Sequence, residues 1–225
     1  MVTENVILMR MAKDSLKGKW GLAIGTFVVY LMIVGAMSAI PILGPLASLF
    51  ISGPMALGIV MFSLSFSRDE DARLEQIFDG FKNYGTALGA YWLMVLYIFL
   101  WMLLLIIPGI IAALSYSMTF YIIADEPTIG ASAAIDKSRK MMDGYKWKYV
   151  CLQFRFFGWA LLCILTLGIG LLWLIPYMYI TLAKFYDDVK QNYNANTINP
   201  NTANTSSDTI DNEDPYTTDN TQNNI

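Results

Sequence analysis

Histidine is missing from this chain of 225 residues, and cysteine occurs only twice. Without histidine, the chain cannot build a Ser-His-Asp triad, a His-x-x-x-His zinc site or an imidazole base. Cys151 and Cys163 lie twelve residues apart in one apolar segment, a spacing that suits neither a disulfide framework nor a metal site. A glycine-rich phosphate loop is also lacking. We therefore expect no metal, no cofactor and no catalytic residue, and interpret both cysteines as packing residues.

Charged side chains are scarce as well, at 15% of residues against roughly 25% in an average soluble domain. They fall in four segments: residues 4–19, 68–82, 125–155 and 184–219. Three charge-free blocks separate these segments: residues 20–67, 83–124 and 156–183. Each block is interrupted near its middle by Gly or Pro. Because a membrane helix needs about 20 apolar residues and a bilayer disfavours buried ions, each block predicts a pair of membrane helices.

The formal net charge of −3 combines two different parts. Residues 1–190 carry 15 basic and 13 acidic side chains, a surplus of +2, whereas residues 191–225 carry five acidic and no basic side chains. The second part is rich in Asn, Thr, Asp and Ser and buries too little apolar surface to offset its ordering entropy. We therefore expect a membrane domain over 1–190 and a disordered acidic tail over 191–225. The body lacks the clustered basic face of a nucleic-acid binder, so we expect no nucleic-acid partner.

The chain also repeats itself with a period of about 64 residues. Asp79-Gly80-Phe81-Lys82 returns as Asp143-Gly144-Tyr145-Lys146. The helix-breaking positions recur: Gly44-Pro45, Pro108-Gly109 and Gly168-Ile169-Gly170. The apolar segment after each break ends in acidic residues: Asp69-Glu70-Asp71, Asp125-Glu126 and Asp187-Asp188. These correspondences predict three repeats, at about residues 1–68, 69–131 and 132–190.

We expect each repeat to form an amphipathic lead-in helix, a membrane helix, a tight turn and a returning helix, in that order. The fold class we expect is an all-α membrane protein of about six transmembrane helices, arranged as three helical hairpins. The charged segments then lie on one side of the membrane and the three turns on the other. Since Lys and Arg mark the cytoplasmic side, we predict a multi-pass cell-membrane protein with both termini in the cytoplasm. The lead-in helices either lie flat at the headgroups or pack on one another as small cytoplasmic hairpins.

The third repeat is short for two spans, because its charge-free block has only 28 residues. A hairpin fits if its first helix begins near Tyr149 and Arg155 either reaches the inner face or pairs with Asp187 or Asp188. The alternative is one long helix over residues 149–187, which would place the tail outside. We favour the hairpin because the repeat predicts it.

Few residues remain as candidates for chemistry. Asp79 and Asp143 open the repeated motif and offer an acid pair, although Asp-Gly is also an ordinary turn sequence in which glycine takes a positive φ. We interpret both as turns. Two GxxxG pairs, Gly21/Gly25 and Gly85/Gly89, predict close helix packing, within the chain or between two copies. Pro54 and Pro176 are interpreted as packing kinks.

Several polar side chains lie on the predicted membrane helices, and we interpret them as bonded to helix backbone or across helices. They are Thr26, Ser48, Ser52, Ser63, Ser115, Ser117, Thr119, Gln153 and Thr166. The aromatic residues near the helix ends, Trp20 and Trp159 among them, fit an interfacial belt better than a ligand cage.

Collinear motifs point to a known family: Lys17-Gly18-Lys19-Trp20, Ile51-Ser52-Gly53-Pro54-Met55-Ala56-Leu57-Gly58, Phe78-Asp79-Gly80-Phe81, Ile107-Pro108-Gly109-Ile110-Ile111 and Leu165 to Tyr177. Over residues 10–189 the chain resembles the bacterial membrane-protein family catalogued as domain of unknown function 975, found mainly in Gram-positive bacteria. It is more distantly similar to the membrane domain of some glycerophosphodiester phosphodiesterases, whose hydrolase domain it lacks. The resemblance implies an integral plasma-membrane protein and carries over no catalytic residue.

Three functions stay open at this point. The first is a non-enzymatic scaffold, assembly or envelope-related factor that acts through lipids or protein partners. The second is an uncoupled transporter or permease for small molecules or lipids, since the predicted helices lack the mid-membrane ionisable residue usual in ion-coupled transporters. The third is a lipid-headgroup enzyme that uses Asp79, Asp143 or other inner acids. We predict the first, with the lipid bilayer as partner and a membrane protein or a second copy as further candidates.

Overall fold

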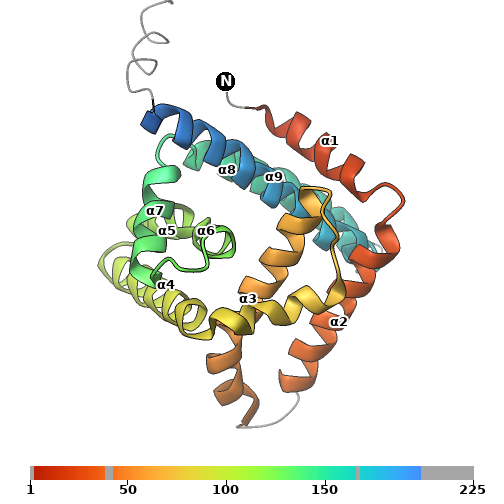
Figure 1. The fold of residues 1–225 in the computed structure, drawn as a ribbon, viewed down its shortest axis with the longest axis horizontal. Coiled ribbons are helices and arrows are strands. Elements are labelled where there is room, and N and C mark those ends of the chain that lie inside the picture. The colour runs from red at the N-terminus through yellow and green to blue at the C-terminus, as the bar shows by residue number, and fades with distance from the viewer. Residues whose placement is uncertain (1–2, 39–42, 166–167, 199–225) are drawn as a thin grey trace, which may run out of the picture.

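The computed structural model describes residues 3–38, 43–165 and 168–198, and every regular element in them is a helix (Figure 1). In chain order these are α1 (Asn5–Leu16), α2 (Trp20–Ser38), α3 (Leu43–Ser67), the 3₁₀ helix η1 (Leu74–Asn83), α4 (Tyr84–Leu104), α5 (Ile106–Tyr116), α6 (Thr119–Asp125), α7 (Ala131–Met141), α8 (Lys146–Leu165) and α9 (Leu171–Ile198). The expected all-α class is confirmed. Each expected repeat contains a short helix followed by two longer segments. These are α1, α2 and α3 in the first repeat, η1, α4 and the pair α5–α6 in the second, and α7, α8 and α9 in the third. The threefold repetition itself stays a prediction.

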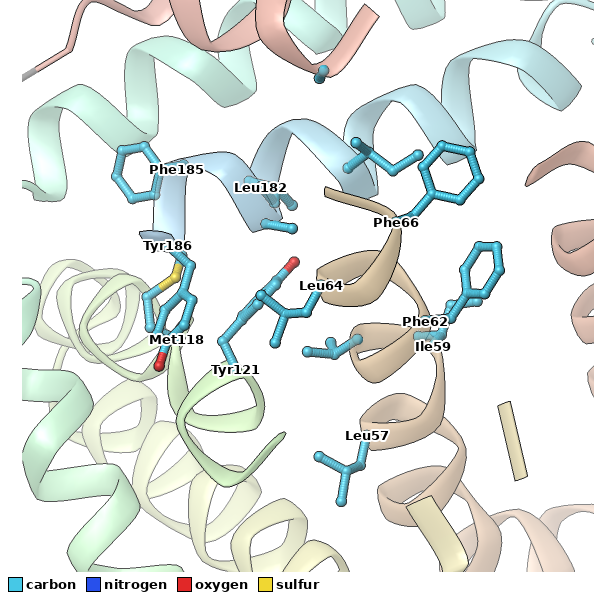
Figure 2. Packing of buried hydrophobic residues seen from close by; sticks show 14 of the residues in the cluster. Leu57, Ile59, Phe62, Leu64, Phe66, Met118, Tyr121, Leu182, Phe185 and Tyr186 are labelled. Carbon is cyan, nitrogen blue, oxygen red and sulfur yellow. The ribbon is translucent and has the colours of Figure 1, made fainter. Parts of the chain in front are cut away.

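Helix α3 forms the centre of the molecule because its second half is apolar on every face. Figure 2 shows Leu64 beside Tyr121 of α6 and Phe66 near α9, whereas Phe62 points to the opposite side of α3, where it packs on Phe27 of α2. Where α6 meets α9, the rings of Tyr121 and Tyr186 stack with their centroids 5.4 Å apart. The main hydrophobic core therefore lies where the three returning segments α3, α6 and α9 meet.

Glycine lets η1 approach the backbone of α3 very closely. A Cβ built on Gly58 would lie 1.7 Å from the carbonyl oxygen of Ile77, and one built on Gly80 would lie 2.0 Å from that of Pro54. The interpretation of Asp79-Gly80 as a positive-φ turn is therefore wrong, because Gly80 lies inside η1 and serves close packing. For the second copy of the motif it is confirmed, since Gly144 has a φ of +78°.

The predicted breaks lie slightly earlier than their prolines. Helix α4 ends at Leu104, Leu105 is extended, and Pro108 is the third residue of α5. Likewise α3 begins at Leu43, so that Pro45 is its third residue. Proline is tolerated in a first helical turn because its missing N–H would have no partner there. The rest of the first predicted turn, residues 39–42, lies outside the described residues.

The lead-in helices pack on the body rather than on one another. Helix α1 lies along α9, η1 lies on α3, and α7 lies against α4 and α6. Their buried faces include Leu8 in α1, Ile77 in η1 and Ile135 in α7. The alternative that these helices pack on one another as small cytoplasmic hairpins is therefore wrong. Their position at the headgroups stays a prediction.

The third repeat forms two helices, so the alternative of one long helix over residues 149–187 is wrong. Helix α8 ends at Leu165, and the chain turns at Gly168, with a φ of +83°, before α9 begins. The two helices are antiparallel, since Lys148 bonds to Asp188 at one end and Phe156 packs on Tyr177 further along.

The sequence predicted that the turn at 168–170 lies on the side opposite to the charged segments, and this prediction is wrong. Gly170 lines one cavity together with Lys13 of α1 and Trp20 at the start of α2. The neighbouring Lys19 reaches Asp69, just beyond the end of α3, with Nζ and Oδ1 3.8 Å apart. Figure 1 accordingly shows α1, α8 and α9 running side by side and crosswise to α2 and α3. These three helices form a layer across the charged ends of α2 and α3.

Of the two placements predicted for Arg155, pairing with Asp187 or Asp188 is wrong, and a position at the inner face stays a prediction. Asp187 bonds to Arg68 and Asp188 bonds to Lys148 instead. Arg155 faces α1, where its Nη1 lies 3.8 Å from the sulfur of Met9. It lies two turns beyond Lys148 on α8 and so does not meet the charged end of α9.

Within the described residues, four helical stretches are long and apolar enough to cross a membrane: Ala47–Ser67, Leu74–Leu104, Ile106–Asp125 and Lys146–Leu165. Helices α1 and α2, bent by 96° relative to each other, add a fifth if they count as one broken span. Helix α9 is not among these stretches, because each of them contains 18 consecutive residues with at most two charged side chains, whereas every 18-residue stretch of α9 contains at least three. Several apolar helices can thus cross a membrane. The number of six, the cell membrane and the orientation of the termini stay predictions.

Helix α9 continues to Ile198, past the domain boundary expected at residue 190. Its last turns are supported by side chains that bond to the helix backbone. Asn192 donates to the carbonyl of Asp188 at 2.7 Å, and Thr197 donates to that of Tyr193 at 2.8 Å. The rest of the predicted tail, residues 199–225, lies outside the described residues.

Candidate functional site

The ends of the three returning segments meet in one cluster of charged side chains, which we call the charged node: Arg68, Asp125, Asp187 and Lys190. Arg68 follows the last residue of α3, Asp125 ends α6, and the other two lie on α9. The sequence showed acids after each returning segment, but not that Arg68 joins two of these groups. A lone base directly before Asp69-Glu70-Asp71 was the available signal.

Arg68 occupies the centre of the node because its planar guanidinium reaches two carboxylates at once. Its Nη1 and Nη2 donate to the two oxygens of Asp125 at 2.7 and 3.0 Å. Nη2 and Nε also donate to Oδ1 of Asp187 at 2.6 and 3.2 Å. The bonds to Asp125, then those to Asp187, raise the pKa of Arg68 above its ordinary value although burial opposes this shift. The guanidinium is therefore a permanent cation.

Asp125 is the most enclosed member of the node, with 8% of its side chain exposed. Besides Arg68, it accepts bonds from Lys190 at 2.6 Å and from the hydroxyl of Tyr186 at 2.9 Å. Lys184, which lies on α9 with Tyr186 and Lys190, donates to the carbonyl of Ser67 at the end of α3. Buried charges are stable only when paired and hydrogen-bonded, and the node meets this condition. It therefore ties α3, α6 and α9 together.

Asp188 makes a second, smaller cluster that holds the start of the chain. It accepts a bond from Lys148 at 2.8 Å and two from Thr3, from the hydroxyl at 2.6 Å and the amide at 3.1 Å. The side chain of Asn5 donates to the carbonyl of Lys148 at 3.0 Å. The beginning of α1 is thus fixed to both α8 and α9.

A small cavity of about 160 Å³ lies beside the charged node and gathers several inner acids. Arg68, Glu70, Asp79 and Asp125 contribute to its wall, with Gln76. Among the described residues, no three potential ligand side chains of His, Cys, Asp or Glu are placed to hold a metal ion. Two of the acids in this wall already bind a cation, since Asp79 binds Lys82 and Asp125 binds Arg68.

The two repeated aspartates do not form an acid pair. Asp79 binds Lys82 at 2.8 Å and Asp143 lies 4.0 Å from Lys146, each within its own i,i+3 pair. Three of the four GxxxG residues do not bring helices together within the chain, since a Cβ on Gly21, Gly25 or Gly85 would meet no atom of the described residues within 4 Å, whereas one on Gly89 would lie 3.4 Å from the Cβ of Ala131 in α7. Close packing within the chain is therefore confirmed at Gly89 and not at the other three glycines, for which contact between copies stays the alternative.

Most polar side chains on the apolar helices satisfy helix backbone, as predicted. Ser52, Ser63, Ser115, Ser117 and Thr119 each donate to a carbonyl three or four residues earlier, at 2.6–2.8 Å. Gln153 instead donates to the hydroxyl of Tyr149 at 2.9 Å. Thr26 is fully buried, and its hydroxyl has no partner within the described part of the chain. Thr166 lies outside the described residues.

Sequence reasoning missed Ser138, which bridges the break between α5 and α6. Its hydroxyl donates to the carbonyl of Ser115 at 2.8 Å and accepts from the amide of Met118 at 3.2 Å. Both backbone groups lose their helical partners where the helix breaks, so Ser138 of α7 replaces those bonds. No pattern in the sequence pairs these positions.

An apolar cavity of about 510 Å³ lies between α5, α8 and α9. Gln153 is the one polar side chain in a wall otherwise made of aliphatic, aromatic and methionine side chains, Leu114, Phe157 and Met178 among them. Its surface is thus suited to hydrocarbon rather than to a polar solute.

Two helix faces leave large apolar side chains exposed. One covers the end of α4 and the start of α5 and includes Leu103, Leu104, Ile106 and Ile107, each 69–74% exposed. The other follows α8 and includes Phe154 and Leu165, 70% and 85% exposed. In both α4 and α8, only 11% of the most apolar stretch is buried within the chain.

Comparisons with known proteins give one match. The model of a family described as "Protein of unknown function (DUF975)" matches residues 1–111 and 102–193. A comparison with curated proteins and one with solved structures found no match.

Proposed function

We propose that this chain, which belongs to the family of proteins of unknown function DUF975, is a non-enzymatic integral membrane protein. It serves as a scaffold, assembly or envelope-related factor that acts through contacts with lipids and other membrane proteins. The observation that carries this proposal is the pair of exposed apolar faces on α4–α5 and α8. Surfaces of this kind mark contacts with a bilayer or a protein partner.

The charged side of the molecule supports the same proposal. The acids best placed for chemistry, Asp79, Asp125 and Asp143, each have a cation beside them. An acid that acts as a general base needs a free lone pair aimed at its substrate. The pairing of these carboxylates favours a structural use and disfavours a lipid-headgroup enzyme.

A carrier of apolar molecules is the second candidate, and the cavity between α5, α8 and α9 favours it. Its volume of about 510 Å³ and its apolar wall would accept part of an acyl chain. A carrier, however, must release what it binds on the other side of the membrane. The node that fixes α3, α6 and α9 to one another opposes the movement that such release requires.

Reconstitution of the purified full chain in liposomes separates the three functions. We expect no solute release and no lipid turnover above those of protein-free liposomes. Photo-crosslinkers introduced at Leu104 and Leu165 should form adducts with lipids or membrane proteins in the cell, because these side chains are exposed. A crosslinker at the fully buried Leu57 is the matched control and should form none.

Solute or lipid flux through the liposomes would replace this proposal by the carrier. Hydrolysis or exchange of headgroups would replace it by the enzyme. Equal crosslinking from Leu57 and Leu104 would show that the exposed faces are not a specific contact surface.

A further inference from the structure

A groove of about 650 Å³ lies between α1, α8 and α9, and its wall is rich in basic side chains. Arg10, Lys13 and Lys17 of α1 line it, and Arg155 of α8 lines it as well. Asp14 is the one acid among the described residues of the wall, and its carboxylate binds Lys17 at 2.6 Å. The remaining three cations give the groove a strong positive charge.

None of these three cations forms an ion pair within the described part of the chain. Asp14 binds Lys17 and attracts Arg10 and Lys13 from a longer distance, and the one hydrogen bond that the described residues show for the Arg155 guanidinium is to the sulfur of Met9, at 3.8 Å. Most other basic side chains of the structure bind a carboxylate or a carbonyl, as Arg68 and Lys148 do. Three unpaired cations in one concave wall attract an anion.

The groove is a fixed feature rather than a gap between loose helices. The hydroxyl of Tyr177 on α9 donates to the carbonyl of Met9 at 3.0 Å, which holds the middle of α1 against the hairpin. The start of α1 is held by Thr3 and Asn5, which bond to Asp188 and Lys148. Arg10 and Lys13 therefore project from a helix whose position is set by hydrogen bonds.

An aromatic cavity of about 380 Å³ adjoins the basic groove and shares Lys13, Trp159 and Tyr177 with it. Trp20 and Trp173 complete this aromatic wall, which also contains Leu174 and Cys163. Tryptophan and tyrosine are the side chains typical of the headgroup level of a bilayer. The site thus changes from basic to apolar along its length.

We propose that this groove binds an anionic phospholipid. The phosphodiester lies between Arg10, Lys13 and Arg155, and the first part of the acyl chains lies along Trp159, Trp173 and Trp20. Basic pockets between helices on the cytoplasmic side of a membrane recognise anionic headgroups in this way. A free phosphate would satisfy the cations but would leave the aromatic wall uncovered. The inference deepens the proposed function, on which it rests, by naming the class of lipid.

Binding of a fluorescent phosphatidylglycerol to the purified full chain in detergent tests the proposal, with phosphatidylcholine as the neutral lipid. We expect a preference for phosphatidylglycerol of at least tenfold, since each cation near an anionic lipid contributes a severalfold gain in affinity. The double substitution Arg10→Gln/Lys13→Gln should weaken phosphatidylglycerol binding by about 30-fold, and adding Arg155→Gln should weaken it further.

The matched control is Arg139→Gln/Lys140→Gln, which removes two exposed cations from another short helix, α7, where neither forms an ion pair with a described residue. It should change the affinity by less than about twofold. Equal weakening by both double variants would overturn the proposal, because it would reduce the effect to general surface charge. Equal affinity for the two lipids would overturn it as well.

Inorganic phosphate distinguishes a lipid site from a site for a free anion. We expect it not to displace phosphatidylglycerol at comparable concentrations, and efficient displacement would overturn the lipid as occupant. Unfolding temperatures in the absence of lipid show that each variant is folded. A failure of lipid binding with liposomes still free of flux and turnover would contradict this site alone and leave the proposed function standing.

Discussion

At the scale of single residues, Arg68 contributes most to the architecture. Its guanidinium donates to two carboxylates on different helices, and its planar fork of donors gives two bonds to each of them. It is 31% exposed, whereas Asp125 is 8% exposed, so the pair lies in a partly desolvated environment. Removing one member of such a pair leaves the other charge without compensation.

The substitution Arg68→Gln should therefore lower the free energy of unfolding by about 2–3 kcal/mol, which corresponds to a fall in unfolding temperature of roughly 5–10 °C. Arg68→Lys should lose about half as much, since it keeps the charge but loses the paired bonds that the guanidinium makes to Asp125 and to Asp187. The measurement is thermal unfolding in detergent or nanodiscs.

Lys82→Gln is the matched control, because it removes one cation from an exposed i,i+3 pair with Asp79. Such pairs contribute less than about 0.5 kcal/mol. If Arg68→Gln and Lys82→Gln had the same small effect, the node would not hold the helices together.

At the scale of elements, contact between η1 and α3 depends on glycine. Gly58 of α3 and Gly80 of η1 each face a backbone carbonyl at a distance that no Cβ tolerates. The sequence shows Gly80 only as part of an Asp-Gly pair, which favours a turn. Nothing in the local pattern indicates that the backbone of another helix approaches it, and this is why the turn interpretation failed.

We expect Gly58→Ala to lower the free energy of unfolding by about 2 kcal/mol or more, because backbone atoms of η1 must move away. A Cβ on Gly25, inside α2, would meet no atom of the described residues within 4 Å. Gly25→Ala should therefore raise the free energy of unfolding by up to about 1 kcal/mol, because alanine has the higher helix propensity. Thermal unfolding of both variants gives the comparison. Opposite signs support the packing described here, and a harmless Gly58→Ala would contradict it.

The limits of the sequence are clearest for the breaks and charges. Helix type, the existence of a break in each unit and the third hairpin follow from apolar block length and Gly/Pro positions, which are local signals. Arg155 and Arg68 show what does not follow, since their partners come from helices far away along the chain. The charged node and the basic groove both depend on how α9 crosses the other helices, and no local pattern encodes that crossing.

At the scale of the whole molecule, the crosswise layer of α1, α8 and α9 is the main departure from three equivalent hairpins. Gly170, Lys13 and Trp20 line one cavity, and Lys19 reaches Asp69 at the end of α3. The third turn thus lies beside the charged ends of α2 and α3. Charges on α9 explain why this hairpin differs, since Lys184 bonds to Ser67 at the end of α3 and Asp187 bonds to Arg68, the next residue.

Cysteine labelling in intact cells tests this arrangement most directly, in a chain whose own cysteines are replaced by Cys151→Ala and Cys163→Ala. The single substitutions are Ile107→Cys at the α4–α5 break, Asp143→Cys in the charged region and Ile169→Cys in the third turn, all at exposed positions. We expect a membrane-impermeant reagent to label Ile107→Cys from outside, and Asp143→Cys and Ile169→Cys only after permeabilisation. Labelling of Ile169→Cys from outside together with Ile107→Cys would contradict the crosswise layer and restore three equivalent spanning hairpins.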